Sequence, residues 1–482
     1  MSLAGVGPRL RASFFGAVVT LTDLLPPRLR YGYVHRITRT MFSGSLPVVE
    51  RAVSRGVASG EVRPARIPDV TCAILTDHLD VGGIGAVVET LATNFETEGV
   101  HPVIVCHGDG VRADRLRRLG IEVRSVSDGA SAAAALAGFG AGVLQLHSAP
   151  EYLERAAMAT GLPMVTVMHN TEIHYTAKKW KSYRTLLEHS AAGIAVSETV
   201  REYHARHLSP ELARRIAVAP NGAPMLSPAT TEDRRSARSA VAEAIGVSLD
   251  DAVLFVCLAR YDSQKNIAGT TVAFARAAQQ RDDIHLVFAG DPSDWAELRR
   301  AQSLRELSDG PRRVHFLGNS DAMTLLTAGD AFLLDSFFEG WPVAATEASA
   351  AGLPLVLSEV GGATELVSRD SEFSIMTANP AGEAAGISDR LVRTARRRTR
   401  HQRGAPALEA AVMAVAARVT AARITAGPVT AGPVTAAPVT AAPRPVPPRA
   451  AAGTADMLHS HARVVRDAVQ ARSSESSSPG SP

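Results

Sequence analysis

The sequence predicts an α/β protein built from two doubly wound parallel-sheet domains of similar size. Three observations support this fold class. Short runs that are apolar throughout alternate with stretches of helical spacing, as expected of parallel strands covered on both faces by helices. These apolar runs fall into two sets. A polar, charged stretch at roughly 225–250, containing TTEDRRSARS, separates the two sets.

The individual elements follow from the same pattern. In the first set, strands are expected at 71–77, 102–108, 142–148, 163–169, 193–197 and 215–222. The first helix between them runs from Ala86 to Glu98 and ends at Gly99, a residue type that favours helix termination. In the second set, strands are expected at 252–259, 284–290, 313–318, 330–336 and 353–358. Ligands of such sheets bind at the carboxyl ends of the strands, so we expect a binding cleft between the domains.

The chain divides into six expected segments. They are a basic N-terminal extension (1–66), an N-terminal domain (67–224), a C-terminal domain (225–395), a linker (396–453), a C-terminal helix (454–472) and a disordered tail (473–482). The linker joins an arginine-rich run to a near-exact five-residue repeat of Pro, Ala, Thr and Val. Regularly spaced proline prevents helix and central strand, so we expect the linker to be semi-rigid and solvated, and both terminal extensions to be flexible.

Composition excludes several classes of protein. Of the 482 residues, 46% are hydrophobic and 21% charged, which is too apolar for a disordered chain and too charged for a membrane bundle. The formal net charge of only +3 argues against a dedicated nucleic-acid binder. Cys72, Cys106 and Cys257 each lie inside an apolar run, so we expect buried, reduced thiols rather than a disulfide framework or a zinc ribbon.

The N-terminal extension carries most of the excess positive charge. Ten arginines stand against Asp23, Glu50 and Glu61 within residues 1–66. A secretory signal peptide is disfavoured because Asp23 interrupts the apolar stretch and no small-residue cleavage site follows. Two interpretations stay open: a basic helix that contacts an anionic membrane, and a solvated appendage. We expect the protein in the cytoplasm, either free or peripheral to the inner membrane face.

A glycine-rich turn follows the first predicted strand. In DHLDVGGIGAV, the residues Gly82, Gly83 and Gly85 open a helix. Glycines let backbone amides approach a ligand closely, and the positive end of a helix dipole favours an anion such as phosphate. The alternative is an ordinary tight strand–helix turn.

Two cations follow the first strand of the second set. In LARYDSQKN, Arg260 and Lys265 lie on the loop that ends this strand, and together they could neutralise a diphosphate. Lys265 is one of only four lysines among 51 basic residues, which suggests a local requirement for lysine. Two cations on a surface loop are the alternative.

Two carboxylates mark the most informative segment, LLDSFFEGWPVAATEASAAGLPLVLSEVGG. Glu339 lies on a loop after a strand, and Glu347 lies eight residues later on the following helix. Two carboxylates aimed at one site can accept hydrogen bonds from vicinal hydroxyls. Gly361 and Gly362 end the next strand in a second turn that could admit a phosphate.

These motifs together resemble family 4 retaining glycosyltransferases. The resemblance rests on the two glutamates in EGWPVAATEASAAGLPLV, on the Arg-x4-Lys after LA, on the GG-x-G loop and on PNG at 220–222, and it covers roughly residues 71–370. It implies the GT-B fold, in which two Rossmann-like domains face a cleft. It also implies transfer of a sugar from a nucleotide diphosphate sugar with retention of anomeric configuration.

The resemblance implies roles for individual residues. Arg260 and Lys265 would bind the donor diphosphate, Glu347 the ribose hydroxyls and Glu339 the transferred sugar. Gly83 and Gly85 would lie over the diphosphate, near the acceptor. His169, in MHNTE, would face the donor sugar, although a structural strand-end histidine is the alternative. Ser197 in AVSE and Asn221 in PNG fit structural roles better than catalytic ones.

The expected chemistry needs no metal and no cofactor. Departure of a nucleoside diphosphate builds negative charge, which Arg260, Lys265 and helix-terminal amides can stabilise in a water-poor site. No Asp-x-Asp metal motif stands at a strand end, and no carboxylate stands out as a covalent nucleophile. Two alternatives share the donor site: a non-catalytic nucleotide-sugar-binding protein and a sugar-nucleotide epimerase. A nicotinamide oxidoreductase is disfavoured because G-x-G-x-x-G with a following acid is missing.

The sequence gives the least information about the acceptor substrate. A sugar, a lipid-linked molecule or another small molecule is expected to bind in the first domain, near Gly82–Gly85 and KKWKSYR at 178–184. The lysines of that stretch could bind an anionic or lipid-linked acceptor, or form a solvated helix face. Residues 455–471 regain helical spacing. The resemblance implies that this helix returns to the first domain and docks there.

Overall fold

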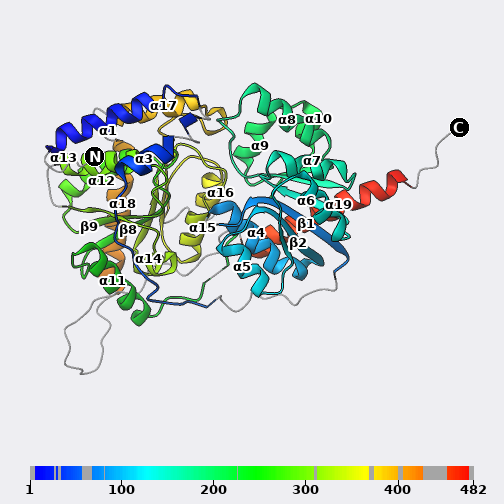
Figure 1. Cartoon of the computed structure of the whole chain (residues 1–482). Coiled ribbons are helices and arrows are strands. Elements are labelled where there is room, and N and C mark those ends of the chain that lie inside the picture. Colours follow the sequence, from blue (N-terminus) through cyan, green and yellow to red (C-terminus); the bar gives the residue numbers. More distant parts are fainter. Residues whose placement is uncertain are drawn as a thin grey trace. The chain divides into compact units, whose positions relative to one another are not determined.

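The computed structural model describes residues 6–26, 29–30, 34–56, 68–80, 82–224, 226–308, 312–368, 374–399, 405–426 and 453–476. The chain forms two compact units. Unit 1 comprises residues 1–58, 225–339 and 344–451, and unit 2 comprises 59–224, 340–343 and 452–482. Both contain a parallel sheet with alternating helices, so the predicted α/β fold of two doubly wound domains is confirmed (Figure 1).

Unit 2 contains a seven-stranded parallel sheet in the order β3-β2-β1-β4-β5-β6-β7. Its strands are β1 (Val70–His78), β2 (Val100–Gly108), β3 (Val123–Ser125), β4 (Val143–His147), β5 (Met164–Met168), β6 (Ala192–Ala195) and β7 (Ile216–Val218). Its helices are α4 (Gly83–Asn94), α5 (Val111–Arg118), α6 (Gly129–Gly138), α7 (Glu151–Ala159), α8 (Ala177–Glu188), α9 (Glu198–Ala205), α10 (Pro210–Arg214) and α19 (Thr454–Ser476). The direction of winding reverses between β1 and β4, and Ile74 of β1 pairs with both Ile104 of β2 and Gln145 of β4. Ligands of such sheets bind at this reversal.

Unit 1 contains a six-stranded parallel sheet in the order β10-β9-β8-β11-β12-β13. Its strands are β8 (Val253–Leu258), β9 (Ile284–Ala289), β10 (Val314–Leu317), β11 (Ala331–Leu334), β12 (Leu355–Ser358) and β13 (Ile375–Thr377). Its helices are α1 (Pro8–Thr22), α3 (His35–Phe42), α11 (Thr231–Ile245), α12 (Ile267–Gln280), α13 (Trp295–Leu307), α14 (Ala322–Ala328), α15 (Val343–Ala350), α16 (Ala363–Ser368), α17 (Asp389–Arg398) and α18 (Pro406–Ala426). The winding reverses between β8 and β11.

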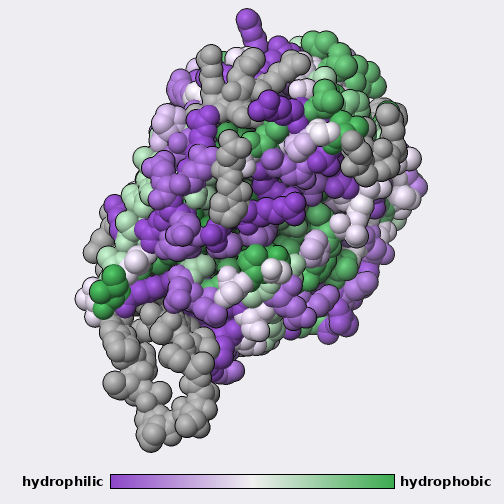
Figure 2. Space-filling view, turned by 90° about the vertical axis from the view of Figure 1, so that its left-hand side faces the viewer, coloured by the Kyte–Doolittle hydropathy of each residue, from purple (hydrophilic) through white to green (hydrophobic). Residues whose placement is uncertain are grey.

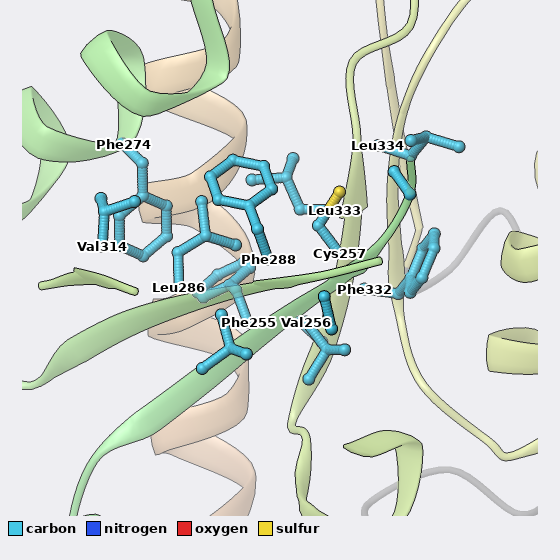
Figure 3. Close-up of a cluster of buried hydrophobic side chains, with 14 of the residues drawn as sticks. Phe255, Val256, Cys257, Phe274, Leu286, Phe288, Val314, Phe332, Leu333 and Leu334 are labelled. Carbon is cyan, nitrogen blue, oxygen red and sulfur yellow. The ribbon is translucent and has the colours of Figure 1, made fainter. Parts of the chain in front are cut away.

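The core of unit 1 lies around β8 and β11, the two central strands of its sheet. Phe255, Phe274, Phe288 and Phe332 are completely buried, and Figure 3 shows their rings among the aliphatic side chains of β8, β9 and β11. Strands buried on both faces explain why these runs are apolar at every position. Cys257 belongs to the same cluster, and burial raises the pKa of its thiol to about 12.

All three cysteines are buried and free, as the sequence predicts. Burial also raises the pKa of Cys72 to about 12 and raises that of Cys106. A protonated, inaccessible thiol is a poor nucleophile and a poor metal ligand. These cysteines therefore act as small core residues.

The N-terminal extension is not a flexible appendage in its described part, which corrects the expectation for 1–66. Helix α1 packs on α13, and Phe15, Val19 and Phe42 join the core of unit 1. Asp23, the acid that interrupts the apolar run, is buried and pairs with Arg396 of α17. Residues 57–67 lie outside the described part.

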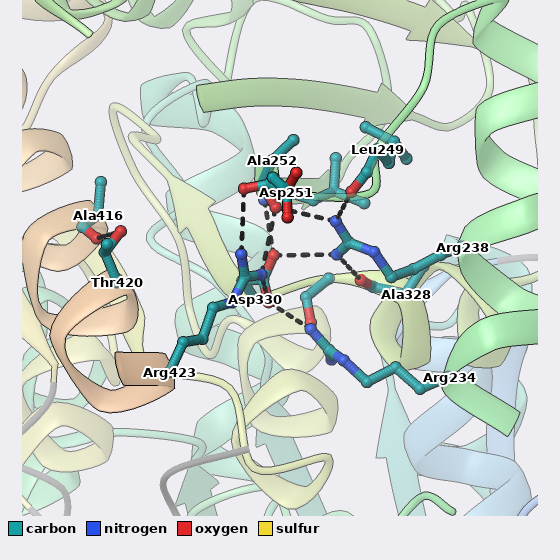
Figure 4. A network of polar contacts seen from close by, with 12 residues as sticks. Arg234, Arg238, Leu249, Asp251, Ala252, Ala328, Asp330, Ala416, Thr420 and Arg423 are labelled. Carbon is teal, nitrogen blue, oxygen red and sulfur yellow. Dashed lines mark hydrogen bonds and ion pairs between the residues drawn. The ribbon is translucent and has the colours of Figure 1, made fainter. Parts of the chain in front are cut away.

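The prediction of a linker at 396–453 is also wrong for the first half of this range. Helix α18 packs against α12, β12 and β13, because Leu408, Val412 and Val415 give it an apolar face. Arg423 near its end joins Arg234 and Arg238 around the buried carboxylate of Asp330 (Figure 4). The proline repeat at 427–452 lies outside the described residues.

The C-terminal helix returns to the N-terminal domain, as predicted. Helix α19 packs against α4 and against β4, β5 and β6 of unit 2. A backbone bridge between Ala223 and Gly453 lies at its start. The final residues, 477–482, lie outside the described part.

None of the described helices has the length and apolar character needed to cross a membrane. On the face drawn in Figure 2, hydrophilic side chains are interspersed with hydrophobic patches.

Candidate functional site

Two loops of unit 1 bring Lys265 and Glu339 together. One loop connects β8 to α12 and the other connects β11 to α15. Because β8 and β11 are parallel neighbours in the sheet, their carboxyl ends lie at the same edge. Lys265 Nζ lies 2.5 Å from Glu339 Oε1, and both side chains are largely buried.

Glu339 is held by three side chains. Besides Lys265, Ser336 donates a hydrogen bond to Oε1 at 2.6 Å, and Gln264 donates one to Oε2 at 3.0 Å. Gln264 also donates to the carbonyl of Phe338 at 2.8 Å, which ties the two loops together. The carboxylate is therefore fixed before any ligand binds.

Arg260 lies on the same loop but points toward solvent. Its guanidinium is 3.2 Å from Asp262 Oδ2, and its side chain is 56% exposed. Asp262 also accepts hydrogen bonds from the backbone amides of Gln264 and Lys265. A carboxylate at the centre of this loop thus orders both of the predicted cations.

The residues that support this site were not predicted from the sequence. Asn266 directly precedes α12 and adopts φ +47°. Its side chain donates a 2.7 Å hydrogen bond to Asp335. Burial raises the pKa of Asp335 to about 7. Gln264 and Ser336 stand within one to three residues of a predicted site residue. This adjacency was the only signal in the sequence for their roles.

Glu347 and the second glycine pair come after β11 and β12, which are neighbouring strands of the sheet. Glu347 is half-buried in the second turn of α15, the helix that follows the Glu339 loop. Gly361 and Gly362 form the turn between β12 and α16, and Gly361 adopts φ +49°, a conformation that favours glycine. All predicted donor residues of unit 1 thus follow the carboxyl ends of β8, β11 and β12.

In unit 2, the glycine-rich turn opens α4. Gly83 is the first residue of the helix. A Cβ at Gly85 would lie 2.9 Å from the carbonyl oxygen of Asp80 and 3.2 Å from Cδ of Arg112. Glycine at 85 is therefore required by close packing within the turn. The free amides of the first turn of α4 could still face an anion.

His169, at the end of β5, belongs to a chain of four buried side chains. His169 Nε2 lies 2.8 Å from His147 Nδ1, and His147 Nε2 lies 3.1 Å from Gln145 Oε1. Gln145 Nε2 lies 3.1 Å from His461 Nδ1 on α19. With this orientation of the Gln145 amide, its oxygen accepts from His147 and its NH₂ donates to His461.

The chain fixes the tautomer of each imidazole. His147 carries its proton on Nε2, so its Nδ1 accepts a hydrogen bond from His169 Nε2–H. The Nδ1 lone pair of His169 is left as an acceptor. Burial lowers the pKa of His169 to about 4 and that of His461 to about 3, and it holds the pKa of His147 well below its ordinary value. All three rings are therefore neutral at pH 7.

Ser197 and Asn221 occupy structural positions. Ser197 caps α9 by accepting from the amide of Val200, and its hydroxyl donates to the carbonyl of Gly340 at 3.0 Å. Next to Asn221, a Cβ at Gly222 would lie 2.5 Å from the carbonyl oxygen of Gly453. The PNG turn thus packs closely against the start of α19, and the neighbouring Asn221 is buried.

The KKWKSYR stretch forms most of α8 and divides into two faces. Trp180 and Tyr183 are buried and pack with Tyr175, Tyr203 and His204. Lys178 and Lys181 are exposed. The aromatic residues therefore serve the core, and Lys178, Lys181 and Ser182 lie on the exposed face of the helix.

Both sheet-containing units match models of known protein families. A model of "Glycosyltransferase Family 4" matches residues 81–225, and one of "Glycosyl transferases group 1" matches 243–404. Together they match more than half of the chain.

Curated relatives match over shorter stretches. An uncharacterized glycosyltransferase, YqgM of Bacillus subtilis, is 24% identical over 253 residues, which are 51% of this chain and 65% of that protein. The D-inositol 3-phosphate glycosyltransferase of Mycobacterium bovis is 30% identical over 168 residues, 33% of each chain. The chain thus spans less than two thirds of either relative.

Solved structures share the fold. The Anabaena Alr3699/HepE structure in complex with UDP-glucose has a TM-score of 0.54 at 17% identity, covering 73% of this chain and 96% of that one. A glycosyltransferase from Rickettsia africae has a TM-score of 0.52 at 15% identity, covering 72% and 98%. The two family matches, the two doubly wound units and this shared fold lead to one conclusion: the chain belongs to glycosyltransferase family 4 and has the GT-B fold.

Proposed function

We propose that the protein transfers a sugar from a nucleotide diphosphate sugar to a hydroxyl group of an acceptor, with retention of anomeric configuration. The observation that carries this proposal is the buried pair of Lys265 and Glu339 at the carboxyl ends of β8 and β11. A fixed ammonium group beside a fixed carboxylate suits a ligand that has a diphosphate at one end and sugar hydroxyls at the other.

The proposed chemistry assigns one task to each residue. Lys265 and Arg260 would stabilise the negative charge that develops on the departing diphosphate, so no metal ion is needed there. Glu339 would accept hydrogen bonds from the transferred sugar, and Glu347 from the ribose. In unit 2, the Nδ1 lone pair of His169 would accept a hydrogen bond from a sugar hydroxyl, and the turn at Gly83 and Gly85 would face the diphosphate.

Nucleotide release from a panel of donors tests this proposal. UDP-glucose is the first donor to try, because the structurally similar Alr3699/HepE was solved with it. An inositol phosphate belongs among the acceptors, because the M. bovis relative is named for that substrate. The assay runs with and without a chelator, and NMR of the product gives the anomeric configuration.

The matched variants are Lys265→Ala, from the site, and Arg118→Ala, which removes an exposed cation at the end of α5. Removing one preorganised donor of this kind lowers kcat by roughly 10²–10³, or about 3–4 kcal/mol. Arg118→Ala should be unaffected. Equal activity of Lys265→Ala and the wild type would contradict the assignment. Donor binding without release would favour a non-catalytic binding protein, and a converted donor without transfer would favour an epimerase.

We also propose that the N-terminal helices bring this activity to an anionic membrane surface. Large hydrophobic side chains are exposed on α1 and just beyond it: Leu10, Leu21 and Leu24 are each about two-thirds exposed (67%, 64% and 66%). Ile37 and Met41 are exposed on α3, and Leu391 on α17. Exposed leucines beside arginines are typical of helices that lie at a membrane interface.

The charge on these helices favours anionic lipids. Exposed arginines accompany the exposed apolar side chains on each of the three helices: Arg9, Arg36, Arg39, Arg390, Arg397 and Arg398. Helix α17 is joined to the end of α1 through Arg396 and Asp23. Each basic residue near an anionic surface contributes about 1 kcal/mol to binding.

Vesicle co-sedimentation tests the membrane proposal. Wild-type protein should sediment with phosphatidylglycerol vesicles more than with phosphatidylcholine vesicles, and salt should weaken the binding. The double variant Leu21→Ser/Leu24→Ser should lose most of it. Val111→Ser, which changes an equally exposed apolar residue in unit 2, is the control. Equal sedimentation with both lipids, or an unaffected double variant, would refute the proposal.

A further inference from the structure

Three metal-ligating side chains meet at the carboxyl ends of β1 and β2 in unit 2. Asp77 and His78 are the last two residues of β1, and His107 is the next-to-last residue of β2. The strands are parallel neighbours, with His78 paired to Gly108. One ligand atom from each of the three side chains lies within 4.8 Å of the others, and His78 Nε2 is 3.6 Å from Asp77 Oδ1.

Gly108 makes room for this arrangement. A Cβ at position 108 would lie 2.2 Å from His78 Nδ1 and 2.7 Å from its Cε1. Any larger residue would displace the ring of His78. With glycine there, the imidazole lies over the end of β2, and its centroid is 5.1 Å from that of His107.

A hydrogen-bond chain sets the tautomer of His107. The Tyr152 hydroxyl donates its single proton to the carbonyl of Val126 at 2.8 Å. It must therefore accept from His107 Nδ1–H, which is also 2.8 Å away. His107 is left with an unprotonated Nε2. Metal-binding histidines are typically held in this way, with the second ring nitrogen donating to an oxygen.

From this juxtaposition we propose that Asp77, His78 and His107 bind a transition-metal ion of the Zn²⁺ class. Two imidazoles and one carboxylate suit Zn²⁺, Co²⁺ or Ni²⁺ better than Mg²⁺ or Ca²⁺, which prefer oxygen ligands alone. Asp77 and His78 are half exposed, so an ion can reach them from solution. Three protein ligands leave at least one coordination position open.

The open position has a natural class of occupant. The cluster lies at the edge of the sheet where ligands of doubly wound domains bind, and its β1 residues are next to the reversal of winding between β1 and β4. A metal ion there would bind an oxygen of the ligand of this unit, either a phosphate or a hydroxyl group. The expectation of metal-independent chemistry concerns the donor diphosphate and the residues of unit 1. The metal proposal does not depend on it.

Metal binding by the full chain, purified without a polyhistidine tag and stripped with a chelator, tests the proposal. Zn²⁺ is titrated in competition with a chromophoric chelator, and Co²⁺ is followed by its visible absorption spectrum. We expect one tight equivalent, with the intense Co²⁺ bands typical of four-coordinate geometry.

Four variants locate the bound ion. His78→Ala and His107→Ala should abolish the tight equivalent. Tyr152→Phe keeps all three ligands and should weaken binding by roughly 10–100-fold, the usual effect of losing an outer-shell partner. The control is His101→Ala, which removes another imidazole of unit 2 that lies 2.8 Å from a carboxylate, that of Glu96.

Two results would overturn the proposal. One is the lack of any tight equivalent in wild-type protein. The other is a tight equivalent that survives His107→Ala or is lost equally in His101→Ala. Thermal melts of each variant without metal separate loss of ligands from loss of fold. Because the readout is binding of the ion alone, the result is independent of whether the donor chemistry proposed above is correct.

Discussion

Gln145 on β4 donates a hydrogen bond of 3.1 Å to His461 on α19, a residue 316 positions later in the chain. The other end of the same amide orients His147, which in turn orients His169. The C-terminal helix thus completes the polar chain that ends at the candidate site of unit 2. His461 is a positioning residue in this arrangement, since it acts on His169 only through Gln145 and His147.

Substitution of His461 should impair turnover while donor binding is preserved. In His461→Ala, Gln145 loses its acceptor, so the ring of His169 is no longer held in one orientation. Misplacement of a substrate-contacting group costs up to about 10²-fold in rate, so we expect kcat to fall between ten- and a hundred-fold. Steady-state kinetics with the preferred donor measures the change in kcat against KM.

Two further variants distinguish positioning from general destabilisation. His461→Asn retains an acceptor atom near the position of Nδ1 and should recover part of the lost rate. His459→Ala changes an exposed histidine of the same helix and should leave kcat unchanged. If His461→Asn were as impaired as His461→Ala, or His459→Ala equally slow, the positioning role would be wrong.

The buried histidines should make the stability of unit 2 depend on pH. The folded-state pKa is about 4 for His169 and about 3 for His461, against 6.5 for an exposed histidine. Between these values the unfolded chain binds more protons than the folded one, so stability falls as the pH drops from 6.5 toward 4. Each such group contributes a slope of at most about 1.4 kcal/mol per pH unit.

Unfolding in denaturant at pH 7.5, 6.0 and 5.0 measures this slope. A double variant, His147→Gln/His461→Gln, removes two of the titrating rings and should flatten the decline. A slope that is identical in the wild type and the double variant would show that other groups govern the acid sensitivity of the protein.

Asp330 should be essential for the stability of unit 1. Its carboxylate is buried among Arg234, Arg238 and Arg423, and it accepts a 2.8 Å hydrogen bond from the amide of Leu254 (Figure 4). Asp330→Asn would leave three arginines without their shared counter-ion. Loss of one partner in such a buried network costs about 3–5 kcal/mol.

Thermal and urea unfolding check this expectation, with Asp250→Asn, an exposed carboxylate, as the control. The arginines hold the pKa of Asp330 well below its ordinary value. The stabilisation it provides is therefore complete above the ordinary aspartate pKa, about 4, and is lost only as the pH falls through the lowered value. A melting curve for Asp330→Asn like that of the wild type would contradict the importance of the network.

Phe15→Ala tests whether α1 belongs to the core of unit 1. The ring of Phe15 is 4% exposed and makes edge-on contacts with Phe14 and Phe42. Truncating a buried phenylalanine costs about 3–5 kcal/mol, whereas an appendage would tolerate the change. Leu10→Ala, on the exposed face of the same helix, should change the free energy of unfolding by less than about 0.5 kcal/mol.

The sequence by itself determined most strands of both sheets and the segments around Lys265 and Glu339, but no expected range covers the short edge strands β3 and β13. Strands buried on both faces must be apolar at nearly every position, so β8 and β11 could be identified from their continuous apolar runs. The segments around Lys265 and Glu339 were recognisable because each follows such a strand directly. Both features depend on residues that are close together in the chain, so they can be identified without knowing which distant segments are in contact.

Only the tertiary structure decided what the charged and polar residues do elsewhere. Asp23 disfavours a signal peptide in the sequence, yet its partner Arg396 lies far along the chain, on α17. Helix α18 lies within an expected linker, and its place in the core depends on its packing against α12, β12 and β13. The meeting of Asp77 and His78 with His107, and of Gln145 with His461, likewise depends on strand order and on the return of α19. The spacing of residues in a sequence indicates which of them share a face of one strand or helix. It does not indicate which side chains from distant segments form hydrogen bonds and ion pairs in the folded protein.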